Sequence, residues 1–265
     1  MLELKHISKT FYPGTVNAKT ALFDLNLTLN DGDFVTVIGG NGAGKSTMLN
    51  AIAGAFSVDS GSMTIDGKNV TKLPEYKRAA FIGRVFQDPM MGTAPTMSIE
   101  ENLALAARRG KRRTLRWGIK KVEREDYREL LRSLDLGLED RLTAKAGLLS
   151  GGQRQALTLL MAALVQPKLL LLDEHTAALD PKTAAKVLEL SEQIVSENHL
   201  TTLMVTHNMR DAIHLGNRLI MMSEGRIVLD ISGEEKKRLT VEQLIARFSA
   251  VSGKEFSNDR VLLGA

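Results

Sequence analysis

The sequence predicts an α/β fold with a mainly parallel sheet, for three reasons. Short apolar strands alternate with helical segments over much of the chain, as they do in βαβ units. A glycine-rich segment lies between an apolar strand and a helix. Residues 88–165 show little strand pattern, so we expect them to form a helical subdomain inserted into the α/β core.

The composition of this 265-residue chain is that of a globular protein. Hydrophobic residues make up 43% and charged residues 25%, which excludes a disordered or collagen-like chain. The 35 basic and 31 acidic residues leave a net charge of +4, which does not by itself indicate nucleic-acid binding. Cysteine is absent, which excludes disulfides and a thiol nucleophile. Because no apolar stretch approaches the ~18 to 20 residues of a membrane span, we expect any membrane role to be peripheral.

The first part of the chain is rich in strand patterns. Leucines alternate with polar residues over 25–30, which predicts a strand with one solvent-exposed face within an antiparallel β subdomain. Residues 34–38 form an almost continuous apolar run, typical of a buried strand. A helix is expected over about 45–56, followed by a strand over 62–65 that ends in a turn.

The pattern changes in the middle of the chain and then returns. Ser98 and Glu101 have the spacing of a capping box, which predicts a helix that continues through Ala107. Asp180 and Pro181 are typical of a helix start, with Asp as the N-cap. The other expected elements are a helix at 122–134, strands at 169–172 and 202–206, a hairpin at 219–229, a surface link at 233–238 and a helix at 240–248.

We expect these elements to form a single domain. Its α/β core would comprise residues 1–87 and 166–232, and its helical subdomain residues 88–165. Residues 233–265 would form a short C-terminal extension.

The strongest motif is a glycine-rich loop that matches the pattern G-x-x-x-x-G-K-[ST]. It reads Gly39-Gly40-Asn41-Gly42-Ala43-Gly44-Lys45-Ser46-Thr47, between the expected buried strand and the following helix. Such a loop turns its N–H groups inward and the helix start adds a positive dipole, so the segment is expected to bind phosphate. Lys45 would reach the β- and γ-phosphates, and the Ser46 hydroxyl would bind Mg²⁺. The alternative, a purely structural glycine turn, is disfavoured by the Lys-Ser pair.

Two carboxylates, Asp173 and Glu174, end the apolar run Leu169–Leu172. Ligands of open α/β folds bind at the carboxyl edge of the sheet, where these side chains are expected. Asp173 is therefore a candidate ligand of Mg²⁺, and Glu174 a candidate general base for an attacking water. The alternative, solvated acids at a strand end, is weaker beside a phosphate loop.

A second helix start also favours anions, in the run Leu149-Ser150-Gly151-Gly152-Gln153-Arg154-Gln155. Ser150 is a good N-cap residue, and two glycines leave the amides of the helix start uncovered. Because only the first site has a lysine and a Mg²⁺ ligand, we expect the second to complete a site in another copy of the chain. A merely capped helix is the alternative.

In order and spacing, these motifs resemble the pattern of ABC-type ATPase domains, over essentially the whole chain. The pattern comprises the phosphate loop, the Leu-Ser-Gly-Gly-Gln run, Leu169–Glu174, Ala177-Ala178-Leu179-Asp180 and His207 after a strand. The resemblance implies a P-loop NTPase fold that binds ATP with Mg²⁺ and dimerises head to tail. Each ATP would lie between the phosphate loop of one copy and Ser150-Gly151-Gly152-Gln153 of the other.

The resemblance also implies roles for four further residues. Gln87 would be the Q-loop glutamine, which senses Mg²⁺ or the nucleophilic water. Asp180 would lie in the loop that crosses the dimer, and His207 would contact the γ-phosphate. Phe11 matches the aromatic residue that stacks on adenine, with Tyr12 as a close rival.

Two features have no fixed role. His175 follows the expected base where many members of the family have Pro or Ala, and a benign substitution is favoured over a ring that tunes the pH response. A basic tract surrounds Trp117, for which a solvated loop and a contact with an anionic membrane surface are equally favoured, ahead of nucleic acid. The tract comprises Arg108, Arg109, Lys111, Arg112, Arg113, Arg116, Lys120 and Lys121.

The resemblance favours the ATPase subunit of a membrane transporter over an ABC ATPase that acts on nucleic acid or the ribosome. The chain has one phosphate loop and no sustained heptads between Gln87 and Leu149. We expect an importer, similar to a branch for amino acids of the tryptophan or tyrosine type, at the cytoplasmic face of the cell membrane. Expected partners are a second copy, integral membrane permease subunits and, indirectly, an extracellular or periplasmic substrate-binding protein, but no nucleic acid.

Overall fold

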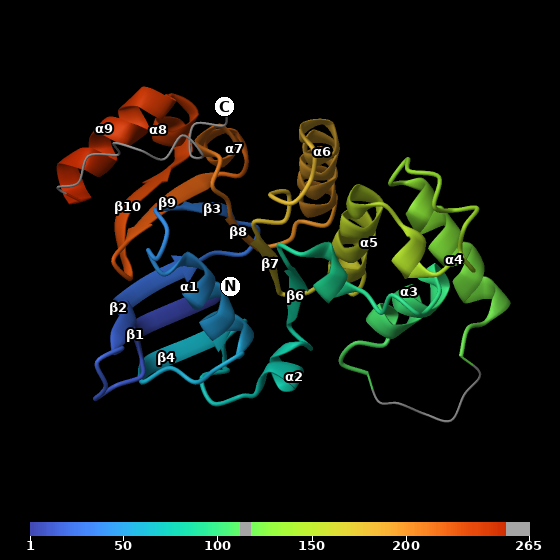
Figure 1. Ribbon diagram of the computed structural model, residues 1–265, viewed down its shortest axis with the longest axis horizontal. Coiled ribbons are helices and arrows are strands. Elements are labelled where there is room, and N and C mark those ends of the chain that lie inside the picture. Colours follow the sequence, from blue (N-terminus) through green and yellow to red (C-terminus); the bar gives the residue numbers. More distant parts are fainter. Residues whose placement is uncertain (112–117, 253–265) are drawn as a thin grey trace. The chain divides into compact units, whose positions relative to one another are not determined.

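The computed structural model describes residues 1–111 and 118–252, which form two compact units (Figure 1). The first unit comprises residues 1–78 and the described residues from 200 onward, and the second comprises residues 79–199. The second unit therefore holds two strands and a long helix besides the helical segment expected at 88–165. The predicted limits of the core and of the helical subdomain stay predictions.

An antiparallel sheet forms one part of the first unit, in the strand order β2-β1-β4-β5. The predicted alternation over 25–30 is confirmed, because Leu25, Leu27 and Leu29 are buried while the residues between them are exposed. The sheet buries one face and leaves the other to solvent, as antiparallel sheets commonly do. Its strands are β1 (Leu2–Phe11), β2 (Lys19–Leu29), β4 (Ser60–Ile65) and β5 (Lys68–Asn69).

The buried strand β3 (Phe34–Ile38) pairs in parallel with β8 (Thr202–Val205) and β9 (Arg218–Ser223) in the same unit. Strand β10 (Arg226–Ser232) pairs antiparallel with β9, which confirms the predicted hairpin. All five residues of β3 are buried, as the apolar run predicted.

Helix α1 (Lys45–Ala53) follows β3 and is shorter than predicted. The expected helix reached residue 56, but Gly54 takes a φ of 87° and its N–H donates to the carbonyls of Asn50 and Ala51. Such a left-handed glycine ends a helix, because it turns the chain and satisfies the last carbonyls.

A buried arginine supports the C-terminal end of α1. Arg78, at the end of the short helix α2 (Glu75–Arg78), is 1% exposed, and its Nη1 donates to the carbonyl oxygens of Ala51 and Ile52 at 2.7 and 2.8 Å. Burial lowers the pKa of Arg78, yet a guanidinium keeps its charge in proteins. A cation at this end is favourable, since the last carbonyls carry partial negative charge.

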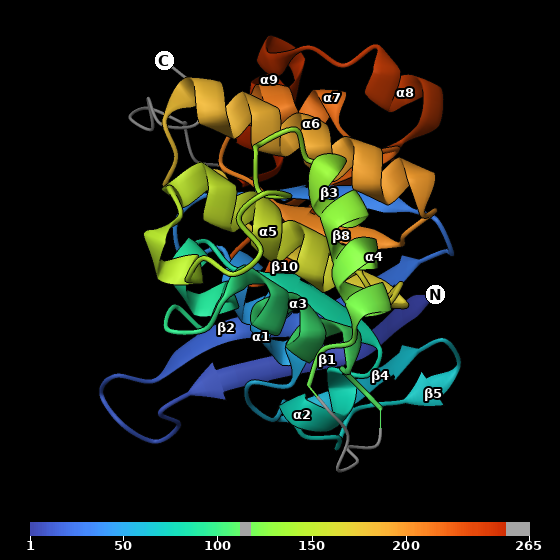
Figure 2. The ribbon, with the colours of Figure 1, turned by 90° about the vertical axis from the view of Figure 1, so that its right-hand side faces the viewer.

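The C-terminal part of the first unit corrects one expectation. Residues 233–238 were expected to be a surface link, but Gly233–Lys237 form helix α8. Lys236 is only 2% exposed, because its ammonium donates to the carbonyls of Leu215 and Gly216 at the end of α7 (Met209–His214). The helix expected at 240–248 is α9 (Val241–Ser252), which lies near α7 and α8 (Figure 2). Residues of α7, α9 and β9 share one apolar cluster.

The second unit combines a parallel strand pair with helices. Strand β6 (Ile82–Val85) pairs with β7 (Leu169–Asp173), and the predicted capping box of Ser98 and Glu101 begins α3. The helices are α3 (Ile99–Ala107), α4 (Lys121–Arg132), α5 (Gly151–Ala163) and α6 (Pro181–Glu197), with 3₁₀ turns at Pro89–Gly92 and Ala146–Leu148.

Within the parts of the chain that the structure describes, no helix of either unit has the length and apolarity to cross a membrane.

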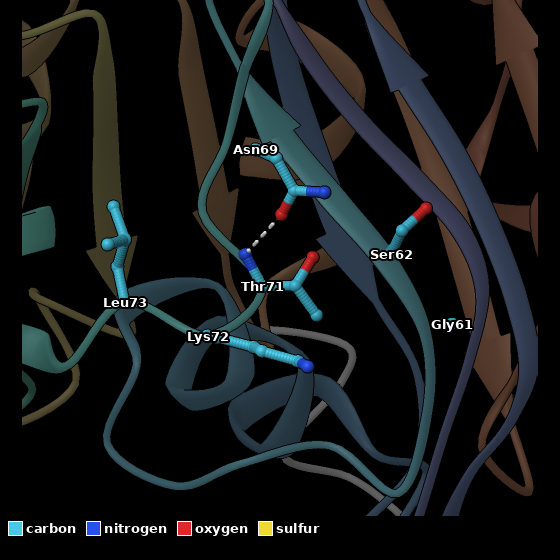
Figure 3. Close-up of a pocket in the computed structure, with 6 residues that line it drawn as sticks. All are labelled: Gly61, Ser62, Asn69, Thr71, Lys72 and Leu73. Carbon is cyan, nitrogen blue, oxygen red and sulfur yellow. Dashed lines mark hydrogen bonds between the residues drawn. The ribbon is translucent and has the colours of Figure 1, made fainter.

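A pocket of about 340 Å³ lies beside β4 and β5 (Figure 3). The amide of Thr71 donates to Asn69 Oδ1 at 3.0 Å, between two of the residues that line the pocket. The residues that line it are Gly61, Ser62, Asn69, Thr71, Lys72 and Leu73. Because none of these belongs to the predicted motifs, the pocket adds nothing to the candidate site.

Candidate functional site

The phosphate loop, residues 39–44, connects β3 to α1 in the first unit. Gly39 and Gly44 take φ angles of 151° and 100°, which L side chains rarely adopt. A Cβ at Gly39 would lie 2.3 Å from the Met222 carbonyl oxygen, and one at Gly44 would lie 2.5 Å from that of Ala21. Gly44 is also the N-cap of α1 and makes no side-chain cap, so the first amides of the helix stay open to an anion.

Lys45 folds back over this loop. Its side chain is 5% exposed, and its Nζ donates to the carbonyl oxygens of Gly39 at 2.7 Å and Gly40 at 3.3 Å. The ammonium is therefore held inside the ring of backbone groups where the motif predicts phosphate. Ser46 is exposed at the start of α1, and Thr47 is half-buried.

His207 lies at the same edge of the sheet as the phosphate loop. Strands β3 and β8 are parallel with Val37 opposite Val205, and the amide of Thr206 donates to the carbonyl of Val37 at 3.1 Å. The segments that follow both strands therefore leave the sheet side by side. His207 is half-buried there, directly before the N-cap of α7, Asn208.

The two aromatic candidates for adenine stacking differ in their surroundings. Phe11, at the end of β1, is half-buried and meets Phe56 edge to face, with ring centroids 5.3 Å apart and planes at 79°. Tyr12 is 70% exposed. Phe11 faces Lys19 across the strand pair, and the Lys19 ammonium lies 3.5 Å from where a Cβ of Gly42 would stand. Phe11 thus has a fixed orientation and a link to the phosphate loop.

Lys19 itself is a residue that the sequence analysis missed. Its ammonium brings a second positive charge next to the phosphate loop, 20 to 25 residues before it in the chain. No motif marks it, because its approach to the loop depends on how β1 and β2 pair. Only the register between Phe11 and Lys19 reveals this position.

In the second unit, Asp173 and Glu174 lie at the carboxyl end of β7. The Asp173 side chain is 14% exposed, and its Oδ2 lies 3.6 Å from Nη2 of Arg84 on β6. Glu174 is 9% exposed and has a φ of 45°, a conformation that is costly for a residue with a Cβ. Glu174 is one of nine non-glycine residues with a positive φ in the described part of the chain, so this conformation forms the turn after β7 and does not by itself mark a functional position.

His175, which had no assigned role, is fully buried. Ser191 Oγ donates to the carbonyl of Val187 at 2.8 Å, so His175 Nε2 is the donor in its own 2.8 Å bond to Ser191 Oγ. This bond ties the segment after β7 to α6. Burial lowers the pKa of His175 to about 4, so the ring stays neutral at physiological pH. A ring that tunes the response near neutral pH is therefore disfavoured.

Gln87 is exposed, directly after β6 and Phe86. The carbonyl of Phe86 accepts a hydrogen bond from Nε2 of Gln155 on α5, at 3.1 Å. The segment that carries Gln87 is thereby tied to the helix that begins at Ser150.

The Ser150 helix start contains a capping box that the sequence analysis did not predict. Ser150 Oγ accepts from the amide of Gln153, and Gln153 Oε1 accepts from the amide of Ser150. A Cβ at Gly152 would lie 2.0 Å from Cγ2 of Thr183 on α6, whereas one at Gly151 would touch Leu179 at 3.4 Å. Gly152 is therefore needed for helix packing, besides any role in binding an anion.

Asp180 is the N-cap of α6, as predicted, and its side chain accepts from the amide of Thr183 at 3.1 Å. Its hydrogen bonds to Thr183 hold the pKa of Asp180 below its usual value. The carboxylate is exposed and stays ionised at neutral pH.

The basic tract is partly structural. Arg112, Arg113, Arg116 and Trp117 lie outside the described residues. Arg108 pairs with Glu123 at 3.1 Å, and Arg109 is half-buried with its Nη2 on the carbonyl of Ala162 at 2.8 Å. These two arginines therefore hold α3 to neighbouring segments.

The described site residues divide between the units. The first unit brings the phosphate loop, Lys45, His207 and Phe11 together, and the second brings Gln87, Asp173 and Glu174 to the ends of β6 and β7. The Ser46 hydroxyl in the first unit, and the Gln87 amide and Asp173 carboxylate in the second, each offer an oxygen donor of the type that Mg²⁺ prefers. Comparison with known proteins shows that residues 22–177 match the model of the ABC transporter family. The chain belongs to this family.

Individual relatives agree with the ABC transporter assignment. A tyrosine transport ATP-binding protein of Clostridioides difficile is 47% identical over 249 residues, covering 94% of this chain and 98% of the relative. A spermidine/putrescine import ATP-binding protein of Haemophilus influenzae is 34% identical over 252 residues, covering 94% of this chain and 62% of that protein. A solved ATP-binding cassette, a dimer in a post-hydrolysis state with ADP and Pi, is 31% identical with a TM-score of 0.74, covering 88% and 98% of the two chains.

As an ABC ATP-binding subunit, the chain has the P-loop fold and is an ATPase that serves transport, which confirms the predicted fold class and activity. Several relatives are transport ATP-binding proteins. This finding supports the transporter prediction and gives no support to the alternative of nucleic acid or the ribosome.

Proposed function

We propose that this ABC subunit powers the import of an amino acid of the tyrosine type, bound peripherally at the cytoplasmic face of the membrane. The relative named for tyrosine transport supports the substrate class, because it is similar along nearly its whole length. The observation that carries the mechanism is the presence of two different glycine-containing helix starts, α1 and α5, in one chain.

Two copies would bind two ATP molecules head to tail. In each site, one copy would supply the phosphate loop and the other the amides and hydroxyl of the Ser150 helix start, with Asp180 at the crossing. Phe11 would stack on adenine, since its ring is already fixed by Phe56. The phosphate-binding set is Gly39, Asn41, Gly42, Ala43, Gly44, Lys45, Ser46 and Thr47, together with Ser150, Gly151, Gly152 and Gln153 of the second copy.

Ser46, Gln87 and Asp173 would hold Mg²⁺ through oxygen atoms. When bound, Mg²⁺ supplies charge neutralisation on the transferring phosphoryl group. Glu174 would accept the proton of the attacking water, since it lies directly after Asp173 at the carboxyl end of β7 and is 9% exposed. Lys45, His207 and Ser150 of the second copy would stabilise the developing negative charge.

The membrane partner would contact the segment after Gln87. Met90 and Met91 follow it and are 49% and 66% exposed, so two adjacent apolar side chains are accessible to a partner there. Permease subunits would dock here, and a substrate-binding protein would act through them. ATP closes the dimer only by binding the closed state more tightly than the open one.

Glu174→Gln tests the catalytic part. Without a base, turnover should fall by roughly 10²–10⁴-fold while ATP still binds, so light scattering should show a stable ATP-bound dimer. Glu192→Gln, the same change at an exposed position of α6, should leave turnover and association as they are. Normal turnover in Glu174→Gln would exclude Glu174 as the base.

Reconstitution with the permease tests the substrate. Tyrosine, and not spermidine, should stimulate ATP hydrolysis in vesicles that contain the complete transporter and its binding protein. Stimulation by the polyamine alone would contradict the proposed substrate class.

A further inference from the structure

Arg84 places a positive charge next to the proposed metal ligand, although no family motif includes it. Its Nη2 lies 3.6 Å from Oδ2 of Asp173, and the two side chains are only 13% and 14% exposed. At such burial, solvent and salt screen the charges much less than at the surface.

The strand register brings the two groups together. Strands β6 and β7 run parallel with Arg84 opposite Leu171, and Asp173 is two residues further along β7. Side chains two apart lie on the same face of a strand, so Arg84 and Asp173 share a face. The long arginine side chain spans the offset of two residues.

A second contact fixes the guanidinium. Its central carbon lies 4.4 Å from the centre of the Phe86 ring, a cation–π arrangement. The carbonyl of Phe86 is in turn bonded to Gln155 of α5. Arg84 is therefore held between an aromatic ring and a carboxylate.

We propose that Arg84 is a positioning residue that holds the Asp173 carboxylate and competes with the divalent cation for it. This inference rests on the proposed role of Asp173. A Mg²⁺ ion approaches a carboxylate oxygen to about 2.0–2.1 Å, so it must displace the guanidinium or bear its repulsion. Arg84 thus keeps Asp173 oriented without metal and lowers the gain in nucleotide affinity that Mg²⁺ gives.

The test compares nucleotide affinities rather than turnover. A fluorescent ATP analogue is titrated into the full chain with Mg²⁺ and with EDTA. The dissociation constant in EDTA divided by the dissociation constant with Mg²⁺ measures the metal's contribution to nucleotide affinity. Arg84→Met keeps the apolar stem and removes the charge, and should raise this ratio about tenfold. Arg84→Lys keeps a charge and should stay closer to the parent chain than Arg84→Met does.

Three further variants complete the design. Arg109→Met, at a half-buried arginine of the same unit, should leave the ratio unchanged. Phe86→Leu removes the stacking contact and should raise the ratio by less than Arg84→Met. It also serves as the test if Arg84→Met does not fold. Asp173→Asn should lower the ratio, because the metal loses a charged oxygen ligand.

The outcomes separate the two proposals. If Asp173→Asn leaves the ratio unchanged, Asp173 is not a metal ligand and the proposed site is wrong. If Asp173→Asn lowers it but Arg84→Met and Phe86→Leu do not raise it, the metal site stands and the competition by Arg84 is overturned.

Discussion

The helix starts of α1 and α5 both present glycines and free amides, but they are built differently. At α1, the carbonyl oxygens of Met222 and Ala21 leave no room for a Cβ at Gly39 and Gly44, so these positions require glycine. No side chain caps the helix. At α5 a capping box satisfies the amides of Ser150 and Gln153, and a Cβ at Gly152 would meet the side chain of Thr183.

This difference indicates which start binds phosphate by itself. Helix α1 has no side-chain cap and carries the buried ammonium of Lys45, so we expect it to be the stronger anion site. Helix α5 is already capped and brings no lysine of its own, so it is suited to complete a site rather than to make one. The positive end of a helix dipole can therefore serve two roles, binding phosphate by itself at α1 and completing a site at α5, and we expect the capping of each helix to decide which.

Lys45→Ala should break the stronger site and have the largest effect. Loss of the ammonium removes the charge that we expect to face the β- and γ-phosphates, so ATP affinity should fall by about 100-fold, or about 3 kcal/mol. Calorimetric titration of ATP measures it. Ser150→Ala in the same titration should bind ATP like the parent chain at protein concentrations too low for pairing, and an equal loss in both variants would contradict the distinction.

Ser150→Ala should act on the paired state instead. The hydroxyl that would reach the other copy is lost together with the cap, so ATP hydrolysis should fall by about tenfold while helix stability falls by about 1 kcal/mol. Ser98→Ala removes the matching capping box of α3 and should cost similar stability with normal hydrolysis. If both variants lose hydrolysis equally, Ser150 acts only as a cap.

Gly152→Ala should have the smallest effect, on folding stability. Its new Cβ would meet Thr183 Cγ2 at 2.0 Å, so the free energy of unfolding in urea should fall by about 1–3 kcal/mol. Gly151→Ala, whose Cβ would meet Leu179 at 3.4 Å, should cost little. Adding Thr183→Ser removes that methyl group and should restore most of the loss; no recovery would point away from packing.

Much of the fold could be predicted because it depends on local pattern. The alternation over 25–30, the buried strand at 34–38 and the Ser98 cap each need only neighbouring residues. The prediction of a surface link at 233–238 was incomplete, because the charged run indicates exposure but not the helix α8. Lys236 is also buried there, since it donates to two carbonyls 20 and 21 residues before it. Such a partner is not visible in a local window.

The candidate site shows the same division. The phosphate loop and the residues after β7 are contiguous runs, so their motifs stand out in the sequence. Lys19 and Arg84 reach the site through strand register, one across β1 and β2 and the other across β6 and β7. The capping box at Ser150 is also present as spacing, since Gln153 follows three residues later, but the two glycines between them equally favour an anion site.

Arg78 makes the far end of α1 matter to its ligand end. Helix α1 has nine residues, so its two ends are about 13 Å apart at 1.5 Å per residue. The guanidinium of Arg78 anchors the carbonyls of Ala51 and Ile52, and through them the axis along which the first amides point. The buried Arg78 therefore supports the proposed nucleotide site from the opposite end of α1. We expect its replacement to lower ATP hydrolysis although Arg78 contacts no residue of the phosphate loop in the hydrogen bonds described above.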